Sequence, residues 1–240
     1  AMENHKYLDK IKSNESPPKV YKNFFSDKEL EDLIDLYQKL PVTVHNKSQN
    51  VIKKRWLKKF NEEIVKHFVE KLTSVLGNFK LDNLKSDDNE DIIGLFQESF
   101  GPIGLHVDGG FNLEDIIYKQ TLVPLDNNGE TVIFKNKFYG YSTNFIKDKN
   151  EINEFQNQST KGKNRRSDIH LSIYGDKEFD KNLHEKYLKH IDYDNLKGLE
   201  IEQVYQWKKG DLFIFDRTHL HSASSNINKK KIGLATFTKK

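Results

Sequence analysis

The stretch of this chain that most constrains its fold is 208-KKGDLFIFDRTHLHSAS-224. A glycine-aspartate turn signal precedes the apolar run Leu212–Asp216, which predicts a buried strand. A second short strand follows it and carries His219 and His221, two residues apart. Because alternate side chains of a strand project from the same face, this pattern predicts two histidines on one face of the second strand.

Short β-like runs continue on both sides of this stretch, after the acidic segment 86–91. Clusters of Gly, Asn and Asp separate most of them, which is typical of a β-sandwich or barrel. The chain is therefore predicted to be α+β and mainly β. The predicted strands are Ile92–Phe100, Gly104–Asp108, Ile116–Leu125, Thr131–Phe138, Ile201–Trp207, Leu212–Asp216, Leu220–Ser224 and Lys231–Thr238.

The N-terminal third is predicted to be helical or irregular. Residues 1–20 are polar and end in two prolines, which is typical of a flexible N-terminal arm. The capping box Ser26–Glu29 begins a helix that Pro41 ends. A second helix is predicted over Leu57–Leu76, where one stripe is apolar and Gly77 follows.

A long insertion at residues 140–200 interrupts the β region. Its first half is rich in Asn, Gln, Lys and Ser, and its second half contains a helical stretch around Phe179–His190. Segments of this length within a β domain commonly serve as lids or binding loops, so we predict a lid-like insertion. The predicted organisation is a flexible arm (1–20), an N-terminal helical support (21–85) and a β core (86–240).

Composition excludes several classes of protein and site. The 240 residues include no cysteine, so a metal would need histidine and carboxylate ligands. The 39 basic and 36 acidic side chains leave a net charge of +3, which argues against nucleic acid as the main partner. No apolar run approaches the ~18 residues of a membrane span, and the start lacks a signal-peptide pattern, so we expect a soluble, cytoplasmic protein. Local basic runs, such as 53–55 and 163–166, are interpreted as solvated faces.

Two His-x-Asp tripeptides are present, at 106–108 and at 190–192. The first lies in a β-like run, where its His and Asp project from the same face and can bind one metal. The second lies at the end of a predicted helix, where residues two apart point in different directions, so we interpret it as a surface pair. A downstream His219 or His221 would complete the two-histidine, one-carboxylate set that leaves positions open on non-haem Fe(II).

Lys231 begins the last predicted strand, ten residues after His221. It shares one strand face with Gly233 and Ala235, whereas larger apolar side chains occupy the opposite face. An ammonium group beside small residues suits an anionic ligand. The pattern therefore predicts an anion-binding lysine within the β structure.

Five motifs follow one another in an order that is informative as a whole: His106-Val107-Asp108, Thr121–Asp126 with Gly129–Phe134, Lys208–Phe215, Leu220-His221 and Lys231. This order resembles the Fe(II)/2-oxoglutarate-dependent dioxygenases, and most closely their prolyl 4-hydroxylase-like branch, which uses lysine where many relatives use arginine. The segment Asn23–Leu30 also resembles the helical start of that branch. The resemblance covers most of the chain outside residues 1–20 and the insertion. It implies a double-stranded β-helix (jelly-roll) core with N-terminal supporting helices.

The resemblance also implies a metal centre. By position, His106, Asp108 and His221 would be the iron ligands and form the catalytic centre. His221 is preferred to His219 because the ten-residue spacing to Lys231 and the preceding leucine match the family pattern.

The implied co-substrate is 2-oxoglutarate, which would chelate the iron and leave one position for O2. Lys231 would bind its distal carboxylate, with auxiliary contacts at Gln97 and at Gln120 or Thr121, where this sequence departs from the family's residues. The implied cofactors are therefore Fe(II), 2-oxoglutarate and O2, and the resemblance allows ascorbate as an additional reductant.

The implied reaction is hydroxylation of an unactivated C–H bond. Because Asp108 is an anionic ligand, no metal position is left for a halide, which favours hydroxylation over halogenation. Peptidyl proline is the first expected substrate, and a small molecule or a sugar is the alternative. The residues expected to line the substrate pocket are Tyr139, Tyr141, Trp207 and Arg217.

Two other interpretations stay open. The chain could be a non-enzymatic jelly-roll binding module in which His106 and His221 are incidental, because a fold does not determine a function. It could also be a cupin-like metal enzyme that does not use 2-oxoglutarate and therefore does not need Lys231. The oligomeric state is not predicted.

Overall fold

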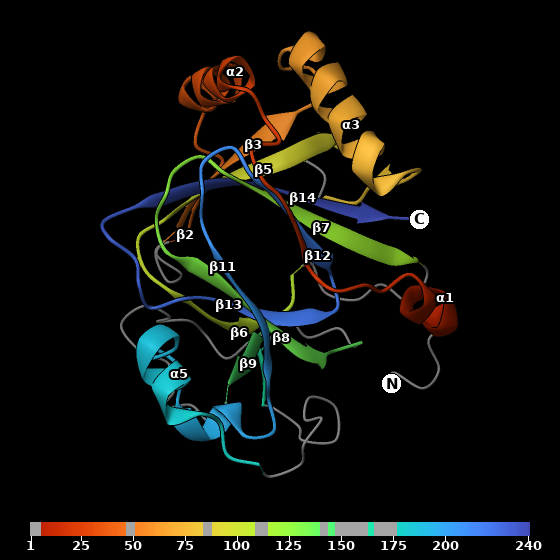
Figure 1. The fold of residues 1–240 in the computed structure, drawn as a ribbon. Helices are drawn as coiled ribbons and strands as arrows, with labels where there is room; N and C mark the ends of the chain where they lie inside the picture. The colour runs from red at the N-terminus through yellow and green to blue at the C-terminus, as the bar shows by residue number, and fades with distance from the viewer. Residues whose placement is uncertain are drawn as a thin grey trace.

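Two β-sheets face each other in the computed structural model, which describes residues 6–46, 51–83, 88–108, 115–139, 144–146, 163–165 and 177–240 (Figure 1). All described strand pairs are antiparallel except β9 with β10. The predicted fold class, a mainly β double-stranded β-helix with N-terminal helices, is confirmed.

The larger sheet has the order β1 (Lys19–Tyr21), β12 (Leu212–Asp216), β7 (Ile117–Pro124), β14 (Lys231–Lys239), β5 (Ile92–Ser99), β3 (Val51–Leu57) and β2 (Val44–Asn46), with β4 (Lys80–Leu81) paired to β14. The smaller sheet has the order β10 (Lys163–Arg165), β9 (Asn144–Ile146), β6 (Ile103–His106), β13 (His219–Ala223), β8 (Glu130–Lys137) and β11 (Ile201–Gln206).

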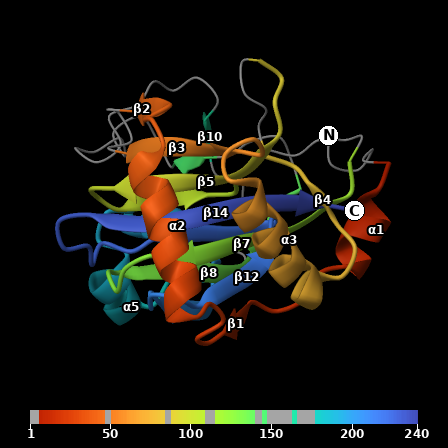
Figure 2. The same cartoon turned by 90° about the horizontal axis from the view of Figure 1, so that it is seen from above.

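Two amphipathic helices cover the outer face of the larger sheet. Helices α2 (Asp27–Lys39) and α3 (Glu62–Leu76) lie across its strands (Figure 2). The predicted capping box begins α2, because the Ser26 hydroxyl accepts from the Glu29 amide and the Glu29 carboxylate accepts from the Ser26 amide. Between these helices and the sheet lies the largest apolar core of the described residues, which includes Leu33, Phe68, Trp56, Phe96 and Leu234.

The helix predicted over Leu57–Leu76 is present as α3 but begins only at Glu62, after an Asn61 cap. Leu57 instead ends β3, a strand that was not predicted and that pairs with β5 along its length. The fully buried Trp56 lies in this strand. Because β3 and β5 pair within one sheet, that sheet contains residues from both sides of the predicted boundary between the helical support (21–85) and the β core (86–240).

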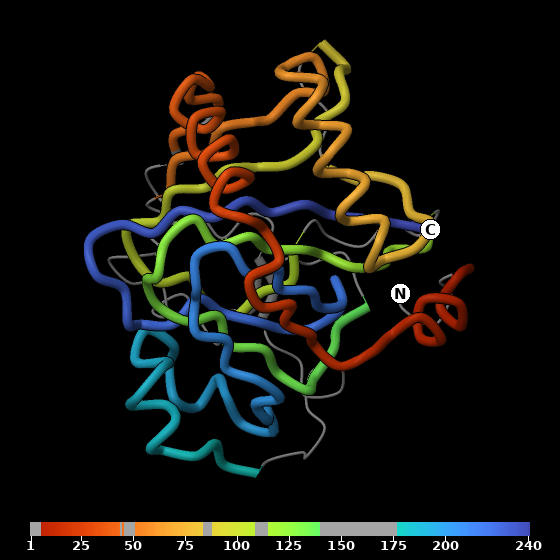
Figure 3. The backbone as a smooth tube through the Cα atoms, turned by 45° about the horizontal axis from the view of Figure 1, so that its top comes forward, coloured from red at the N-terminus to blue at the C-terminus, as the bar shows by residue number. Residues whose placement is uncertain are grey.

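The N-terminal segment is packed against the sheets where the structure describes it, so the prediction of a flexible arm over residues 1–20 is wrong for these residues. Helix α1 (Leu8–Ser13) buries Ile11, and β1 pairs with β12. Figure 3 shows the segment after α1 running along the side of the sheets toward α2. Lys119 Nζ donates to the Asn14 carbonyl at 3.0 Å and to Ser16 Oγ at 2.7 Å. A polar segment can be ordered by such buried polar partners, which the sequence pattern does not reveal.

The described end of the insertion, residues 177–200, forms a packed layer. Helix α5 (Lys181–Tyr187) and the short 3-10 helix η3 (Tyr193–Leu196) lie against the outer face of the smaller sheet, where Leu188 and Leu196 are fully buried beside Phe134. This part is therefore a second core, which corrects the expectation of a lid for it. Residues 140–143, 147–162 and 166–176, where a lid was also expected, lie outside the described residues.

Within the described ranges, no helix combines the length and apolarity that a membrane-spanning helix needs.

Candidate metal centre and active-site cavity

A cavity of about 630 Å³ lies between the two sheets. The inner face of β14 contributes Lys231, Gly233 and Ala235 to its wall, whereas Leu234 belongs to the outer core. This is the alternation that the sequence predicts for this strand. The cavity is therefore lined by the side chains that the strand pattern directs inward.

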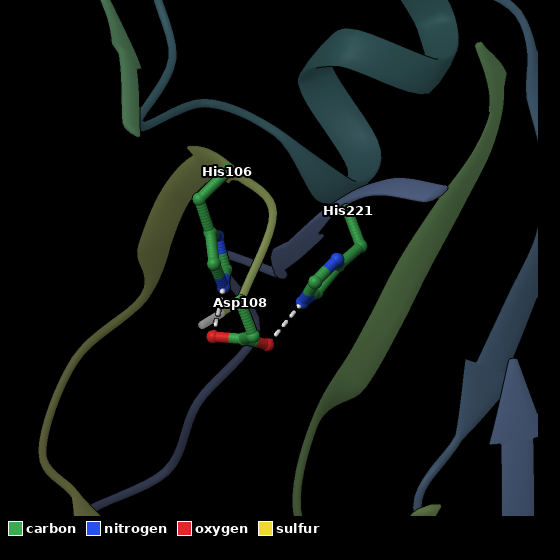
Figure 4. Close-up of side chains that lie close together, drawn as sticks. All are labelled: His106, Asp108 and His221. Carbon is green, nitrogen blue, oxygen red and sulfur yellow. Dashed lines mark hydrogen bonds and ion pairs between the residues drawn. The ribbon is translucent and has the colours of Figure 1, made fainter. Parts of the chain in front are cut away.

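Three potential metal ligands converge on this cavity. His106 ends β6, Asp108 follows it by two residues, and His221 lies on β13 directly opposite His106 in the antiparallel register. His221 Nε2 lies 2.8 Å from Asp108 Oδ2, and His106 Nε2 lies 3.4 Å from Asp108 Oδ1. Figure 4 shows both imidazoles directed at the carboxylate. One ligand atom from each residue lies within 4.8 Å of the others, so one metal ion can contact all three.

The backbone sets the orientation of both imidazoles. His106 Nδ1 lies 2.7 Å from the Gly104 carbonyl oxygen, and His221 Nδ1 lies 3.0 Å from the His219 carbonyl oxygen. Because a carbonyl only accepts, each Nδ1 carries the proton and donates it. Each Nε2 is therefore the nitrogen left for a metal, which is the usual arrangement of a ligating histidine.

The electrostatics of the three groups also suit a bound cation. Burial works to raise the pKa of Asp108, but the imidazoles of His106 and His221 outweigh it and hold that pKa well below its usual value. Burial works to lower the pKa of His106, and the Asp108 carboxylate outweighs it. Burial together with His106 lowers the pKa of His221. A partly buried carboxylate held ionised by two imidazoles fits a divalent metal in place of the protons. Two nitrogens with one oxygen match the facial triad of non-haem Fe(II).

His219 and His221 point in different directions, contrary to the prediction that they share a strand face. The register of β13 against β8 shifts between them, so the pairing is irregular at this point. His219 Nε2 lies 2.9 Å from Glu202 Oε2, and its Nδ1 accepts the Asp216 amide at 3.2 Å. Only His221 of the two therefore stands beside Asp108.

The second His-x-Asp tripeptide has a structural role. His190 is partly buried rather than on the surface as predicted, and its Nε2 lies 2.9 Å from the Ile103 carbonyl oxygen and 3.0 Å from Ser222 Oγ. Burial lowers its pKa to about 4. Asp192 caps η3 by accepting the Asp194 amide. A neutral histidine that connects β6 and β13 supports the two strands that carry the metal ligands.

Lys231 is a buried cation without a carboxylate partner among the described residues. It is 3% exposed, and its Nζ lies 4.1 Å from the centre of the Trp207 ring. Burial lowers its pKa to about 8, against the opposing effect of Asp126 and Glu130, which lie beyond ion-pair distance. Position 233 must be glycine here, because a Cβ would lie 2.7 Å from the Trp207 ring.

Gln97 and Thr121, the auxiliary positions predicted for 2-oxoglutarate, both line the cavity. Gln97 Nε2 donates to Ser99 Oγ at 3.0 Å. The Thr121 hydroxyl donates to the Thr236 carbonyl at 3.5 Å. Gln120, the other residue considered for that position, faces the cavity, but its amide contacts Asp108.

The residues predicted for the substrate pocket separate into three groups. Trp207 and Arg217 line the cavity, and Trp207 Nε1 donates to Thr131 Oγ1 at 2.8 Å. Tyr139 does not line it, because its hydroxyl donates to Glu15 Oε1 at 2.6 Å in the N-terminal segment. Tyr141 lies outside the described residues.

Lys53 is a cavity residue that sequence reasoning missed. It was assigned to a solvated face, but it lines the cavity, and its charge opposes the raised pKa of His106. Its neighbour Lys54 points to the other face of β3, where its Nζ donates to the Tyr37 carbonyl at 2.9 Å. The alternation of charged residues in a strand would have indicated two different faces, had β3 been predicted as a strand.

No protein-family model matches the sequence, and no curated protein matches it. Solved structures are similar in fold. HygX from Streptomyces hygroscopicus, with nickel, 2-oxoglutarate and hygromycin B bound, is 10% identical with a TM-score of 0.51 over 98% of this chain and 86% of that chain. A 2OG-Fe(II) oxygenase family oxidoreductase from Burkholderia pseudomallei is 10% identical (TM-score 0.49, 100% and 90%).

A viral collagen prolyl hydroxylase from Paramecium Bursaria Chlorella virus-1, in complex with 2OG, is 12% identical with a TM-score of 0.47 over 93% of this chain and 96% of that chain. At such identities a likeness shows architecture. The chain therefore has the double-stranded β-helix fold of HygX, with a candidate two-histidine, one-carboxylate metal centre between its sheets.

Proposed function

We propose that this protein is an Fe(II)- and 2-oxoglutarate-dependent dioxygenase that hydroxylates an unactivated C–H bond of a small molecule. The observation that carries the proposal is one cavity that contains both the His106, Asp108 and His221 cluster and the unpaired cation Lys231. A metal centre and an anion site within the same enclosure match the two binding requirements of a keto acid chelated to iron.

Each of these residues has a defined part in the proposed chemistry. His106, Asp108 and His221 hold the metal through three positions and leave the others for ligands. Lys231 binds the distal carboxylate of 2-oxoglutarate, and the Trp207 ring beside it excludes water from that contact. Bound iron and 2-oxoglutarate supply the oxidation of a C–H bond by O2. The protein supplies orientation, charge and a dry cavity.

The size of the cavity supports a small-molecule substrate. A cavity of about 630 Å³ lies in the range typical of small-molecule sites, and the co-substrate takes part of it. HygX, the similar structure with the highest TM-score given above, holds hygromycin B. Peptidyl proline, the first expectation from the sequence, is the second candidate.

The decisive experiment is an anaerobic titration of the metal-free protein with Fe(II) and 2-oxoglutarate. We expect a weak visible charge-transfer band, loss of that band in His106→Ala, and succinate formation once O2 is admitted, measured with and without ascorbate. Absence of both band and succinate would identify a binding module. Oxidation that proceeds without 2-oxoglutarate and is unchanged in Lys231→Ala would identify a cupin-like enzyme that does not use 2-oxoglutarate.

A further inference from the structure

Gln120 contacts the metal-binding carboxylate from the opposite sheet. It lies on β7, is 6% exposed and faces the cavity, in register with the cavity residues Phe215 and Phe237. Its Nε2 donates to Asp108 Oδ2 at 2.9 Å. Among the described residues, Gln120 has the only side-chain amide that contacts a potential metal ligand. Its strand, β7, carries none of the three potential ligands.

The orientation of this amide is determined by chemistry. Gln120 Nε2 is the atom that lies against Asp108 Oδ2, and a carboxylate oxygen accepts the hydrogen bond that an amide NH2 group donates. The other end of the amide, Oε1, is then buried and has no donor among the described residues. A buried acceptor without a donor destabilises a folded protein, and an apolar side chain of similar size would avoid this. Gln120 is thus unfavourable for packing and suited to holding Asp108.

We propose that Gln120 is a positioning residue for the metal centre. By donating to Oδ2 of Asp108, it would fix the orientation of the carboxylate and favour binding of a metal through one oxygen only. With two imidazoles, a carboxylate bound through one oxygen fills three positions and keeps the rest open for co-substrate and O2. The inference rests on the proposed function, because it assumes that the site binds a metal.

The test compares Gln120→Met with Gln97→Met, the same substitution at a second glutamine of the same cavity that contacts Ser99 and no metal ligand. Metal-free proteins are titrated with Co2+ in the absence of 2-oxoglutarate, and the visible absorption of the bound ion is recorded. We expect Gln120→Met to weaken Co2+ binding about 10- to 100-fold, as loss of a contact to a metal ligand usually does. We also expect a changed absorption intensity, because a released carboxylate alters the coordination number. Gln97→Met should bind Co2+ like the wild type.

Thermal unfolding of the metal-free variants separates positioning from a structural role. Gln120→Met removes the unmatched acceptor, so its midpoint should equal or exceed that of the wild type while metal affinity falls. If Gln120→Met does not fold, Gln120→Asn keeps the amide but shortens its reach, and the same weakening is expected.

The outcomes are distinct. A wild type that binds no Co2+ contradicts the proposed function itself. A wild type that binds Co2+, with Gln120→Met within twofold of it, overturns the inference alone. Equal losses in Gln120→Met and Gln97→Met, or a loss that parallels a lower unfolding midpoint, also overturn it, because either result indicates general damage to the cavity.

Discussion

A buried cation lies near each end of β14, and the two cations differ in whether a carboxylate pairs with them. Arg217 is 4% exposed, and its Nη1 donates to Asp82 Oδ2 at 2.6 Å and to the Thr238 carbonyl at 3.0 Å. Lys231 is 3% exposed and has the face of Trp207 as its neighbour, without a carboxylate in ion-pair distance among the described residues. Both line the same cavity.

Burial alone therefore does not distinguish a structural charge from a functional one. A buried charge with a hydrogen-bonded partner is tolerated, and breaking the pair leaves an uncompensated ion. A buried charge without a partner shifts toward its neutral form, as the lowered pKa of Lys231 indicates. Such a cation gains most from an anionic ligand, so Lys231 is assigned to binding and Arg217 to stability.

The largest expected effect concerns the paired cation. Arg217→Met leaves Asp82 partly buried with only the longer 3.5 Å contact to Lys239, so the free energy of unfolding should fall by about 3 kcal/mol. The dissociation constant of 2-oxoglutarate should stay within threefold. Urea denaturation and ligand titration measure the two quantities. Lys135→Met, which removes an exposed pair with Glu200, is the control and should change stability by less than about 1 kcal/mol. A similarly small change for Arg217→Met would contradict the structural assignment.

For the unpaired cation, Lys231, we expect a large effect on ligand binding and little effect on stability. Lys231→Met removes the proposed partner of the distal carboxylate, and we expect the dissociation constant of 2-oxoglutarate to rise about 100-fold, equivalent to about 2.7 kcal/mol. Stability should be unchanged or higher, because a desolvated charge is lost. The charge-transfer band reports binding, and Lys230→Met, at the exposed neighbouring position, is the control. If the affinity for 2-oxoglutarate is unchanged in Lys231→Met, its distal carboxylate binds at another residue, and Lys53 is the next candidate.

The smallest effect is a pH dependence of the same contact. Because the pKa of Lys231 is about 8 in the free protein, about half of the lysine is charged at pH 8 and about a tenth at pH 9. The dissociation constant of 2-oxoglutarate should therefore rise about fivefold from pH 8 to pH 9 and change little below pH 7. Lys231→Arg stays charged and should abolish this rise. The effect of pH on stability has the opposite direction. The pKa of Lys231 in the native state lies below its value of about 10.4 in the unfolded state. Lys231 therefore increases the free energy of unfolding as pH rises from about 8 to 10. A flat affinity profile in the wild type would exclude Lys231 as the anion site.

Much of the β core could be predicted because its signals are local. Each of the eight β-like runs corresponds to a strand of the structure, from β5 to β8 and from β11 to β14. Strand alternation placed Lys231 and Gly233 on the cavity face, and the His-x-Asp pattern placed two side chains together at the end of β6. The prediction of local structure failed where partners far away in the sequence determine it. Examples are β3, which pairs with β5, and the packed N-terminal segment, where β1 pairs with β12.

The sequence by itself determined the order of strands and turns, the ligand types available without cysteine, and the side chains that each strand directs to one face. Only the tertiary structure decided that His219 contacts Glu202 rather than Asp108, that Gln120 reaches Asp108 from another sheet, and that Asp82 neutralises Arg217. The physical reason is the range of each interaction. Periodicity and turn chemistry act over a few residues, whereas a partner across two sheets depends on the register of strands far apart in the chain, which no local pattern encodes.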